Sequence, residues 1–340
     1  MRIALLAVTG ASLYLLAPSL LEILTSWPEL KDAAPGWLAL AVLFEGTSYV
    51  SLWTLQRIAL RSRSWFAIGT SQLAASAAGS VVPGGGAAAT ALQYRLLVAA
   101  GIEAGTVASG LGAAWAATTA TALALPLVAV LAAIGGTPAP DGLRQVAFIG
   151  SGAFVVVAGL AGAALAWDWP LRAAGRAVRA AARRAGKGER FETLPEHLLR
   201  QRDGVRRAFA ARPVLAVLAA VGKWAFDYVA LVCVLAALGA RPDPALVLLA
   251  YAASALLAMI PITPGGLGFV EAGLAGLLGL AGVPVATAAV ATLGYRLISF
   301  WMPLPAGGVA YLLARRRYGA ARSSASATSS LTSETRTVPP

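Results

Sequence analysis

Six ionisable residues lie within long apolar stretches of this 340-residue chain: Glu45, Arg95, Lys223, Asp227, Glu271 and Arg296. An ionised side chain inside a bilayer costs about 3 kcal/mol on insertion scales, so such residues usually face a cavity or a partner. Lys223 and Asp227 are four residues apart, a spacing that favours a structural ion pair on one helix face. The other four are candidates for binding a charged substrate or for pairing between helices.

Arg296 and Glu45 allow the most specific hypotheses. Arg296 lies too deep in its apolar segment for its guanidinium to reach the membrane surface easily. It could hold a phosphate through two parallel hydrogen bonds, pair with Glu271, or alternate between the two. Glu45 could be a neutral carboxyl, a proton-coupling group or a partner of Arg95, although Arg95 could instead reach the inner surface. The sequence leaves these alternatives open.

Two apolar regions are interrupted by the same kind of motif, "VVPGGGAAA" and "IPITPGGLGFVE". A break at membrane depth exposes backbone groups, which is tolerated where protein or a watery cavity covers them. The helix that restarts directs free N–H groups at that cavity, and glycines let a phosphate oxygen approach them. The alternative is that each motif is only the tight tip of a helical hairpin. The predicted substrate-binding residues are Pro83, Gly84, Gly85, Arg95, Pro264, Gly265, Gly266, Gly268, Glu271 and Arg296.

The composition predicts an all-α integral membrane protein, because 58% of the residues are hydrophobic and only 12% are charged. Six full transmembrane helices are predicted near 3–25, 36–58, 105–134, 145–168, 213–239 and 285–312. The first could pass for a signal peptide, but its long apolar region and the absence of a clean cleavage site favour a retained helix. The interrupted regions 65–102 and 245–282 have arms of about 15 residues, whereas a crossing needs about 20. Re-entrant helical hairpins are therefore predicted there, rather than pairs of short tilted spans.

The two interrupted regions belong to an internal repeat. A shift of 181 positions aligns Pro83 with Pro264, and the same shift aligns the following glycines, Gly101 with Gly282, and Thr106 with Thr287. Each unit, 36–134 and 213–312, reads as a span with an acidic residue, a broken hairpin and a second span. The units enter the membrane from opposite sides. Inverted repeats of this kind are typical of transporters, whose substrate sites lie between the repeats at discontinuous helices.

The net charge of +12 is concentrated at one side of the predicted membrane, with 12 of the 27 Lys and Arg residues in the loop 170–212. The stretch "RRRYGAAR" carries four more. This positive-inside distribution predicts a multi-pass protein of the cell membrane with both termini cytoplasmic, and it does not indicate nucleic-acid binding. Four arginines of the loop recur at helical spacing: Arg172, Arg176, Arg179 and Arg183. They predict either a helix on anionic lipids of the inner leaflet or a solvated connector.

The remaining features exclude several functions. The polar tail 323–340 is predicted to be disordered. Cys233 is the only cysteine and His197 the only histidine, so neither a disulfide framework nor a metal site is predicted, and no cofactor is expected. The chain contains no GxxxxGK[ST] motif, which disfavours ATP-driven pumping by this chain alone.

The stretch "IPITPGGLGFVEAGLAGLLGLAGVP", followed by "LGYRLISFWMPLPAGG", resembles the membrane region of lysylphosphatidylglycerol synthases and the stand-alone, flippase-like proteins built on that region. The resemblance covers roughly residues 1–315. The matching residues of the second motif are Pro264, Gly265, Gly266, Gly268, Glu271, Gly282, Arg296, Trp301 and Pro303. The first motif keeps Pro83, Gly84, Gly85, Arg95 and Gly101 but lacks a counterpart of Glu271, which puts its contribution to a site in doubt.

The resemblance implies lipid translocation, because in two-domain members the membrane region is thought to move an aminoacylated lipid while a soluble domain makes it. The roughly 25 polar residues after the last predicted span are too few for such a domain. We therefore expect a flippase or scramblase for an anionic-headgroup phospholipid or a polyprenyl-phosphate-linked lipid, with membrane lipids as partners and an oligomer compatible with the sequence.

Three other functions compete with lipid translocation. A small-solute or proton-coupled secondary transporter would also be built from inverted repeats. A partner subunit without transport activity is disfavoured by the ionisable residues deep in the apolar segments. A membrane-embedded lipid-phosphate transferase is less favoured, because the short outside loops hold no paired carboxylates. An enzyme is therefore not expected.

Overall fold

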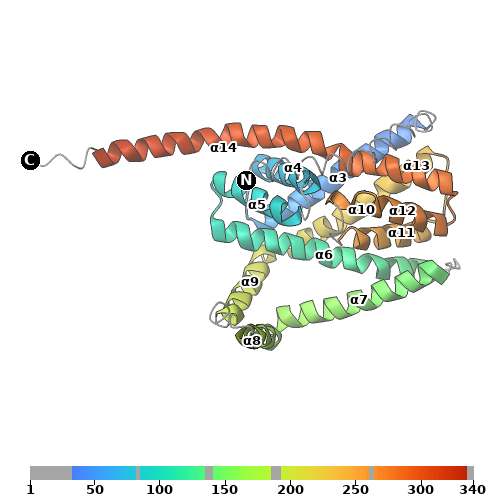
Figure 1. Cartoon of the computed structure of the whole chain (residues 1–340), viewed down its shortest axis with the longest axis horizontal. Helices are drawn as coiled ribbons and strands as arrows, with labels where there is room; N and C mark the ends of the chain where they lie inside the picture. Colours follow the sequence, from blue (N-terminus) through green and yellow to red (C-terminus); the bar gives the residue numbers. More distant parts are fainter. Residues whose placement is uncertain (1–32, 82–84, 135–140, 185–192, 260–263, 335–340) are drawn as a thin grey trace, which may run out of the picture.

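The computed structural model describes residues 33–81, 85–134, 141–184, 193–259 and 264–334, and within these ranges every regular element is a helix (Figure 1). The first predicted span, 3–25, lies outside the described residues, as do Pro83 and Gly84.

Long apolar helices coincide with the other predicted spans. They are α3 (Pro35–Ala59), α6 (Ala104–Ile134), α7 (Asp141–Ala166), α10 (Pro213–Ala237) and the run of α13 (Val285–Arg296), the π-helical turn η3 (Leu297–Trp301) and α14 (Pro303–Glu334). Four segments in the described part are long and apolar enough to cross a membrane: Pro35–Ala59, Ala104–Leu127, Pro213–Ala237 and Val285–Tyr318. The chain is thus an α-helical multi-pass membrane protein, while the count of six spans stays a prediction.

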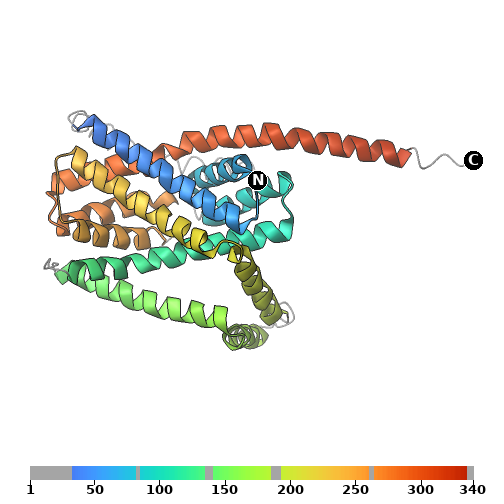
Figure 2. The same ribbon diagram turned by 180° about the vertical axis from the view of Figure 1, so that it is seen from behind.

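Helices α3 and α10 lie side by side along one face of the bundle (Figure 2). Each begins with a proline, whose missing N–H group costs nothing at the first helical position. The rings of Phe44 and Phe226 stack between them with centroids 6.2 Å apart, and the Ser48 hydroxyl donates to the Lys223 carbonyl over 2.8 Å. This contact places the buried acidic residues of the two helices, Glu45 and Asp227, at one interface.

Both interrupted regions form broken helical hairpins at the predicted places. The first consists of α4 (Trp65–Val81) and α5 (Gly86–Ala99), and the second of α11 (Pro244–Leu257), the short turn η2 (Pro264–Gly266) and α12 (Phe269–Leu280). At 1.5 Å per residue these helices are about 18 to 26 Å long, shorter than the roughly 30 Å of a hydrocarbon core. The hairpins occupy opposite halves of the bundle, the first in the half that carries α9 and the second in the other half (Figure 1). This placement agrees with re-entry from opposite sides, which stays a prediction.

The internal repeat is visible in local geometry. Helices α5 and α12 both end at a glycine with φ of 89°, Gly101 and Gly282. The N–H groups of the next residues, Ile102 and Val283, bond back to the last helical turn over 3.2 and 3.0 Å. This glycine cap with a left-handed backbone satisfies free carbonyls at the end of a helix. The following helices, α6 and α13, begin 181 positions apart, the offset found in the sequence.

The basic loop forms two helices, α8 (Trp169–Arg184) and α9 (Leu194–Phe209). Helix α8 is seen end-on in Figure 1 and therefore lies across the direction of the long helices. Asp168, just before α8, accepts hydrogen bonds from Arg172 at 3.1 Å and from Arg202 of α9. The guanidinium of Arg202 holds the pKa of the Asp168 carboxyl below its ordinary value. These contacts tie the two basic helices to the end of α7.

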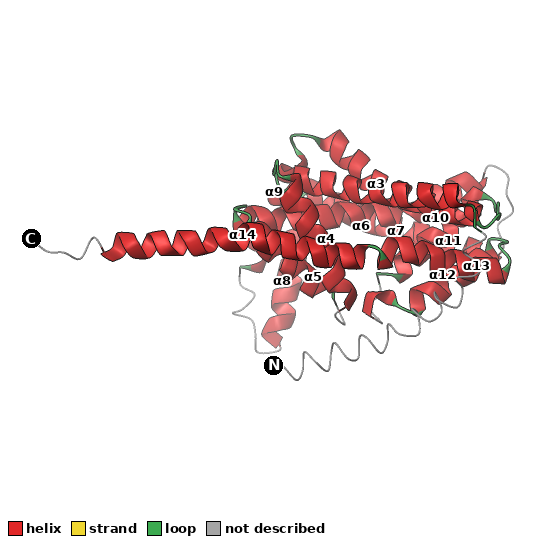
Figure 3. Cartoon of the chain, turned by 90° about the horizontal axis from the view of Figure 1, so that it is seen from above, coloured by secondary structure: helices red, strands yellow, loops and turns green. Residues whose placement is uncertain are grey.

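Helix α14 continues to Glu334 and projects beyond the bundle (Figure 3). Residues 323–334, for which the composition predicts disorder, are therefore helical in this structure. The stretch 320–334 contains neither proline nor glycine, so no strong helix breaker interrupts the helix there. Nearer the bundle α14 packs tightly on α4, because a Cβ at Gly307 would lie 2.4 Å from the Leu73 carbonyl oxygen.

Candidate functional site

Arg296 binds two groups at the break of the second hairpin. Its Nε atom donates to Oε1 of Glu271 over 2.7 Å, and its Nη2 atom donates to the Gly265 carbonyl over 2.9 Å. The guanidinium also lies 4.3 Å from the centre of the Phe300 ring. Both side chains of the ion pair are nearly buried, with 11% and 9% exposed. Of the two roles open for Arg296, the structure shows pairing with Glu271.

Local backbone structure positions these groups. Gly265, Gly266 and Gly268 have φ of 61°, 75° and 76°, a region that favours glycine, and they turn the chain from η2 into α12. Glu271 then lies in the first turn of α12, where a carboxylate is stabilised by the helix dipole. Arg296 ends α13, directly before the π-helical turn η3. The sequence predicts that the positive end of α12 faces an anion. In the structure this end lies next to the carboxylate of Glu271.

A second buried cluster surrounds Asp227. Lys223 donates to its Oδ2 atom over 2.7 Å, which is the pair expected from their spacing. The hydroxyl of Tyr251 donates to the same oxygen over 2.8 Å, and the hydroxyl of Tyr295 donates to Oδ1 over 2.6 Å. Glu45 lies beside this cluster and is 7% exposed, and its Oε2 atom is buried without a hydrogen-bond partner.

One cavity of about 260 Å³ connects the two clusters. Among its lining residues are Glu45, Lys223, Asp227, Tyr295 and Arg296. Tyr295 and Arg296 are adjacent in the sequence, but Tyr295 bonds to Asp227 and Arg296 bonds to Glu271. Tyr49 also lines the cavity, so it exposes two cations, two carboxyl groups and two phenols to whatever enters it. These are groups that can bind an anion and exchange a proton.

The tips of the two hairpins meet at a neighbouring cavity of about 330 Å³, lined by Gly86 of the first and Gly265 of the second. The approach is close, because a Cβ at Gly265 would lie 3.4 Å from the Ser80 carbonyl oxygen and 2.6 Å from the Phe300 ring. Gly85 is also packed against its own hairpin, with a Cβ there falling 1.9 Å from the Gly79 carbonyl oxygen. The described parts of both motifs thus face one region between the repeats.

Two grooves of apolar character adjoin this region. One, of about 1030 Å³, is lined by α3, α4, α5 and α6, and three glutamine side chains lie at its wall. The other, of about 650 Å³, lies between α3 and α14 and includes Glu45, Tyr49 and Trp53. A polar cavity can hold a polar headgroup, and apolar grooves beside it can hold apolar chains.

Sequence reasoning missed the glutamine cluster of the first hairpin. Gln56 donates to Gln72 over 2.6 Å, and Gln93 donates to Gln56 and Gln72 over 3.0 and 2.9 Å. The three residues come from α3, α4 and α5, so no spacing in the sequence links them. The detectable signal is the occurrence of one glutamine in each of three apolar segments.

Arg95 is the predicted site residue that the structure leaves apart from the others. It lies exposed on α5, toward the end of that helix at Ala99. Among the described residues no ion pair joins Arg95 to Glu45. The position agrees with a side chain reaching for the inner surface.

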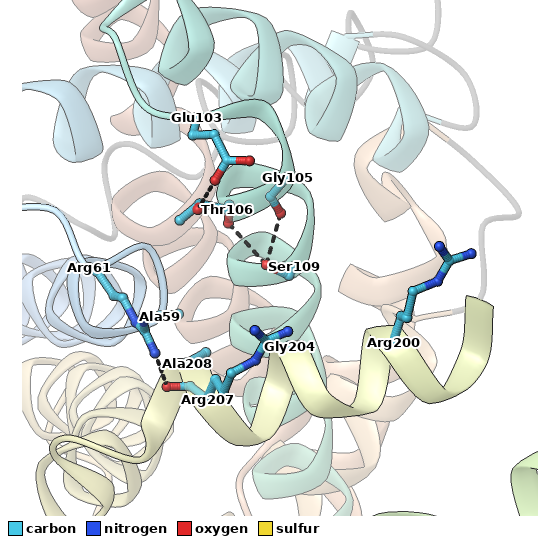
Figure 4. Close-up of a pocket in the computed structure, with 10 residues that line it drawn as sticks. All are labelled: Ala59, Arg61, Glu103, Gly105, Thr106, Ser109, Arg200, Gly204, Arg207 and Ala208. Carbon is cyan, nitrogen blue, oxygen red and sulfur yellow. Dashed lines mark hydrogen bonds between the residues drawn. The ribbon is translucent and has the colours of Figure 1, made fainter. Parts of the chain in front are cut away.

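A basic cavity of about 500 Å³ lies at the end of the bundle that carries α9 (Figure 4). It contains Arg61 after α3, Arg200 and Arg207 on α9, and Glu103 before α6. Arg61 donates to the Arg207 carbonyl over 2.8 Å, and Thr106 donates to Glu103 over 2.6 Å. Three guanidinium groups against one carboxylate give this cavity the character of an anion site.

The fold and the clusters define a multi-pass α-helical membrane protein with broken helices around a buried polar cavity. The family profile described as "lysylphosphatidylglycerol synthase TM region" matches residues 2–307, and the chain belongs to this family. A curated relative is the UPF0104 membrane protein PH1989 of Pyrococcus horikoshii, 38% identical over 93 residues. That match covers 27% of this chain and 28% of the relative.

Proposed function

We propose that the protein moves an anionic-headgroup lipid between the leaflets of the cell membrane, with both termini cytoplasmic. The substrate class is a phospholipid or a polyprenyl-phosphate-linked lipid. The observation that supports this most directly is Arg296, a buried guanidinium that joins the broken tip of one repeat to the cavity between the repeats. Moving a lipid is also in keeping with a membrane region that is not itself a catalytic domain.

In the proposed mechanism the lipid phosphate replaces Glu271 as the partner of Arg296. A guanidinium binds a carboxylate and a phosphate with the same fork of N–H groups. Exchange of one anion for the other keeps the Arg296 guanidinium compensated. The displaced Glu271 carboxylate then has to reach the water of the cavity or take up a proton, because a buried carboxylate without a partner is costly. The exchange also releases the first turn of α12, whose N–H groups then face the phosphate. Acyl chains would occupy the apolar grooves during passage.

The basic cavity and α8 belong to the same proposal. Lipid phosphates of the inner leaflet would first meet Arg61, Arg200 and Arg207, and α8 would lie on the anionic surface with its arginines toward the headgroups. The anionic inner leaflet is thus the proposed partner of the basic loop.

The test is leaflet exchange in liposomes that contain the purified protein. Fluorescent anionic, zwitterionic and polyprenyl-phosphate lipids are compared for the parent, Arg296→Ala, Arg296→Lys and Glu271→Gln. We expect exchange of an anionic lipid that falls at least about tenfold in Arg296→Ala, because a lost charge-assisted hydrogen bond to the substrate costs about 1.5 to 3 kcal/mol. Arg296→Lys keeps the charge without the fork and falls less. Arg241→Ala, an exposed arginine outside the site, is the matched control.

Exchange of no lipid by folded parent protein would overturn the proposal. It would favour a small-solute or proton-coupled transporter, which the buried carboxyl groups of the cavity would also suit. Equal exchange by the parent and Arg296→Ala would leave lipid movement intact but remove the site from it.

A further inference from the structure

Glu45 and Asp227 form a pair of neighbouring carboxyl groups with unequal surroundings. Both line the cavity of about 260 Å³ and both are buried, with 7% and 5% of their surface exposed. Two buried carboxyl groups at one small cavity repel each other when both are ionised, which favours a proton on one of them. The geometry decides which of the two carries the proton.

Asp227 has the environment of a carboxylate. Both of its oxygens accept hydrogen bonds, from the Lys223 ammonium and from the hydroxyls of Tyr251 and Tyr295. Glu45 has the environment of a carboxylic acid, because its Oε2 atom is buried without a hydrogen-bond partner and no ion pair joins it to a cation among the described residues. Glu271 also has a buried Oε2 atom without a partner, but its Oε1 atom is paired with the Arg296 guanidinium. An ionised Glu45 without such a cation at that depth would cost several kcal/mol.

The groups that face Glu45 come from every helix around it. Lys223 and Asp227 belong to α10, Tyr295 and Arg296 to α13, and Tyr49 to α3 itself, while α4 contributes the neutral Gln72. With Arg296 paired to Glu271, the two cations are balanced by two carboxylates. The net charge of the region is therefore zero when Glu45 is protonated and negative when it is not. A negative cavity repels an anionic headgroup, whereas a neutral one admits it.

Glu45 can exchange a proton with water through the polar cavity of about 260 Å³ that it lines. This space is larger than a water molecule needs and offers polar partners. Glu45 also borders the apolar groove of about 650 Å³ between α3 and α14, the space proposed for an acyl chain. A carboxyl group in a cavity that opens first to one side of the membrane and then to the other can take up a proton on one side and release it on the other.

We propose that Glu45 is a proton-binding site whose proton travels with the anionic lipid, so that the proton gradient drives lipid movement. This inference rests on the proposed function. In each cycle water on the loading side gives one proton to the Glu45 carboxylate, and the headgroup binds at Arg296. After the repeats reorient, the headgroup leaves and Glu45 returns the proton to water on the other side. By linkage, each ligand strengthens binding of the other by the same factor.

The test imposes a pH gradient across liposomes that contain the full chain and a fluorescent anionic lipid. We expect net lipid movement by the parent to follow the gradient, with rates toward the alkaline side several-fold above those toward the acidic side, and a trapped pH dye to record lipid-dependent proton flux. Glu45→Gln, a permanently neutral side chain of the same shape, should exchange lipid at equal rates in both directions. Glu45→Asp should keep the gradient response. Glu196→Gln on exposed α9 should behave as the parent.

Lipid exchange by the parent that ignores the gradient would overturn proton coupling while leaving the proposed function in place. A full gradient response in Glu45→Gln would do the same. Absence of all lipid exchange would overturn the proposed function. The proton site is then read separately, as an infrared band of a protonated carboxylic acid that is present in the purified parent and lost in Glu45→Gln. A parent without that band would refute the proton site whatever the transport result.

Discussion

At the scale of single residues, the buried ion pair of Arg296 and Glu271 is the least expected feature for a protein in an apolar medium. Removing two charges from water is costly, and such pairs are often no more stable than apolar residues of the same volume. This pair also bonds to the Gly265 carbonyl of the break. A free backbone carbonyl at that depth needs a donor, and the guanidinium supplies it. The pair therefore joins α13 to the break of the second hairpin.

A prediction about stability follows from this pair. Arg296→Ala leaves the Glu271 carboxylate and the Gly265 carbonyl without a donor, and we expect a loss of about 3 kcal/mol in the free energy of unfolding in detergent. Glu271→Gln retains a hydrogen-bond acceptor and should lose less. In the double variant the buried charge is absent, so its loss should be smaller than the sum of the single losses by about 1 to 2 kcal/mol. Strict additivity would show that the two side chains do not interact.

The residue scale also shows what a sequence can and cannot predict. The pair of Lys223 and Asp227 follows from helical spacing, and Glu271 was one of two partners foreseen for Arg296. Tyr251 and Tyr295 were not foreseen as donors to Asp227, because they lie 24 and 68 positions away and meet it only through the packing of α10, α11 and α13. A buried tyrosine needs a partner for its hydroxyl, but the sequence does not say which one.

At the scale of elements, the hairpin tips depend on glycine for two different reasons. The glycines of the second break have left-handed backbone geometry, which disfavours any side chain. Gly85 of the first break has an ordinary φ of −58° and is required by packing, because its Cβ would collide with the Gly79 carbonyl. The neighbouring Gly86 has open space at its Cβ position. Alanine substitutions at these two adjacent glycines are therefore expected to have different effects on stability.

Gly85→Ala should push α4 and α5 apart at the tip and lower the free energy of unfolding by about 2 kcal/mol, the range of overpacking in a tight core. Gly86→Ala should be neutral or stabilising by about 0.5 kcal/mol, because it restricts the unfolded chain without a clash. Thermal unfolding in detergent measures both. Equal effects of the two substitutions would contradict the close approach of α4 and α5 described here.

The sequence predicts some features of the elements and not others. The breaks and the lengths of the hairpin arms follow from proline and glycine positions. The caps at Gly101 and Gly282 were not predicted, although the sequence aligns these two glycines. The π-helical turn Leu297–Trp301 was not predicted either, because its sequence suits an ordinary α-helix and the extra residue per turn depends on its neighbours. Turns of this type often occur at functional sites, and this one directly follows Arg296.

At the scale of the whole molecule, charge is collected at one end of the bundle. The basic cavity of Figure 4 should contribute to loading of anionic lipid, because each arginine near an anionic surface contributes about 1 kcal/mol. The double variant Arg200→Gln/Arg207→Gln should lower exchange of an anionic lipid about tenfold at low salt and weaken its salt dependence. Arg315→Gln/Arg316→Gln removes the same charge from exposed positions on α14 and should have a smaller effect. Equal loss in the two variants would assign the effect to net charge alone.

The inverted repeat makes the strongest prediction about the molecule in its membrane. Glu103 and Pro284 occupy equivalent positions after the capping glycines of the two repeats, and both are exposed. They follow α5 and α12, which lie in opposite halves of the bundle (Figure 1). The native Cys233 is buried, so a new cysteine can be labelled over a low background. In sealed vesicles of known orientation, an impermeant maleimide should label Glu103→Cys only from the cytoplasmic side and Pro284→Cys only from the other. Labelling of both from one side would refute the inverted arrangement, and with it a site formed where the two hairpins meet from opposite faces.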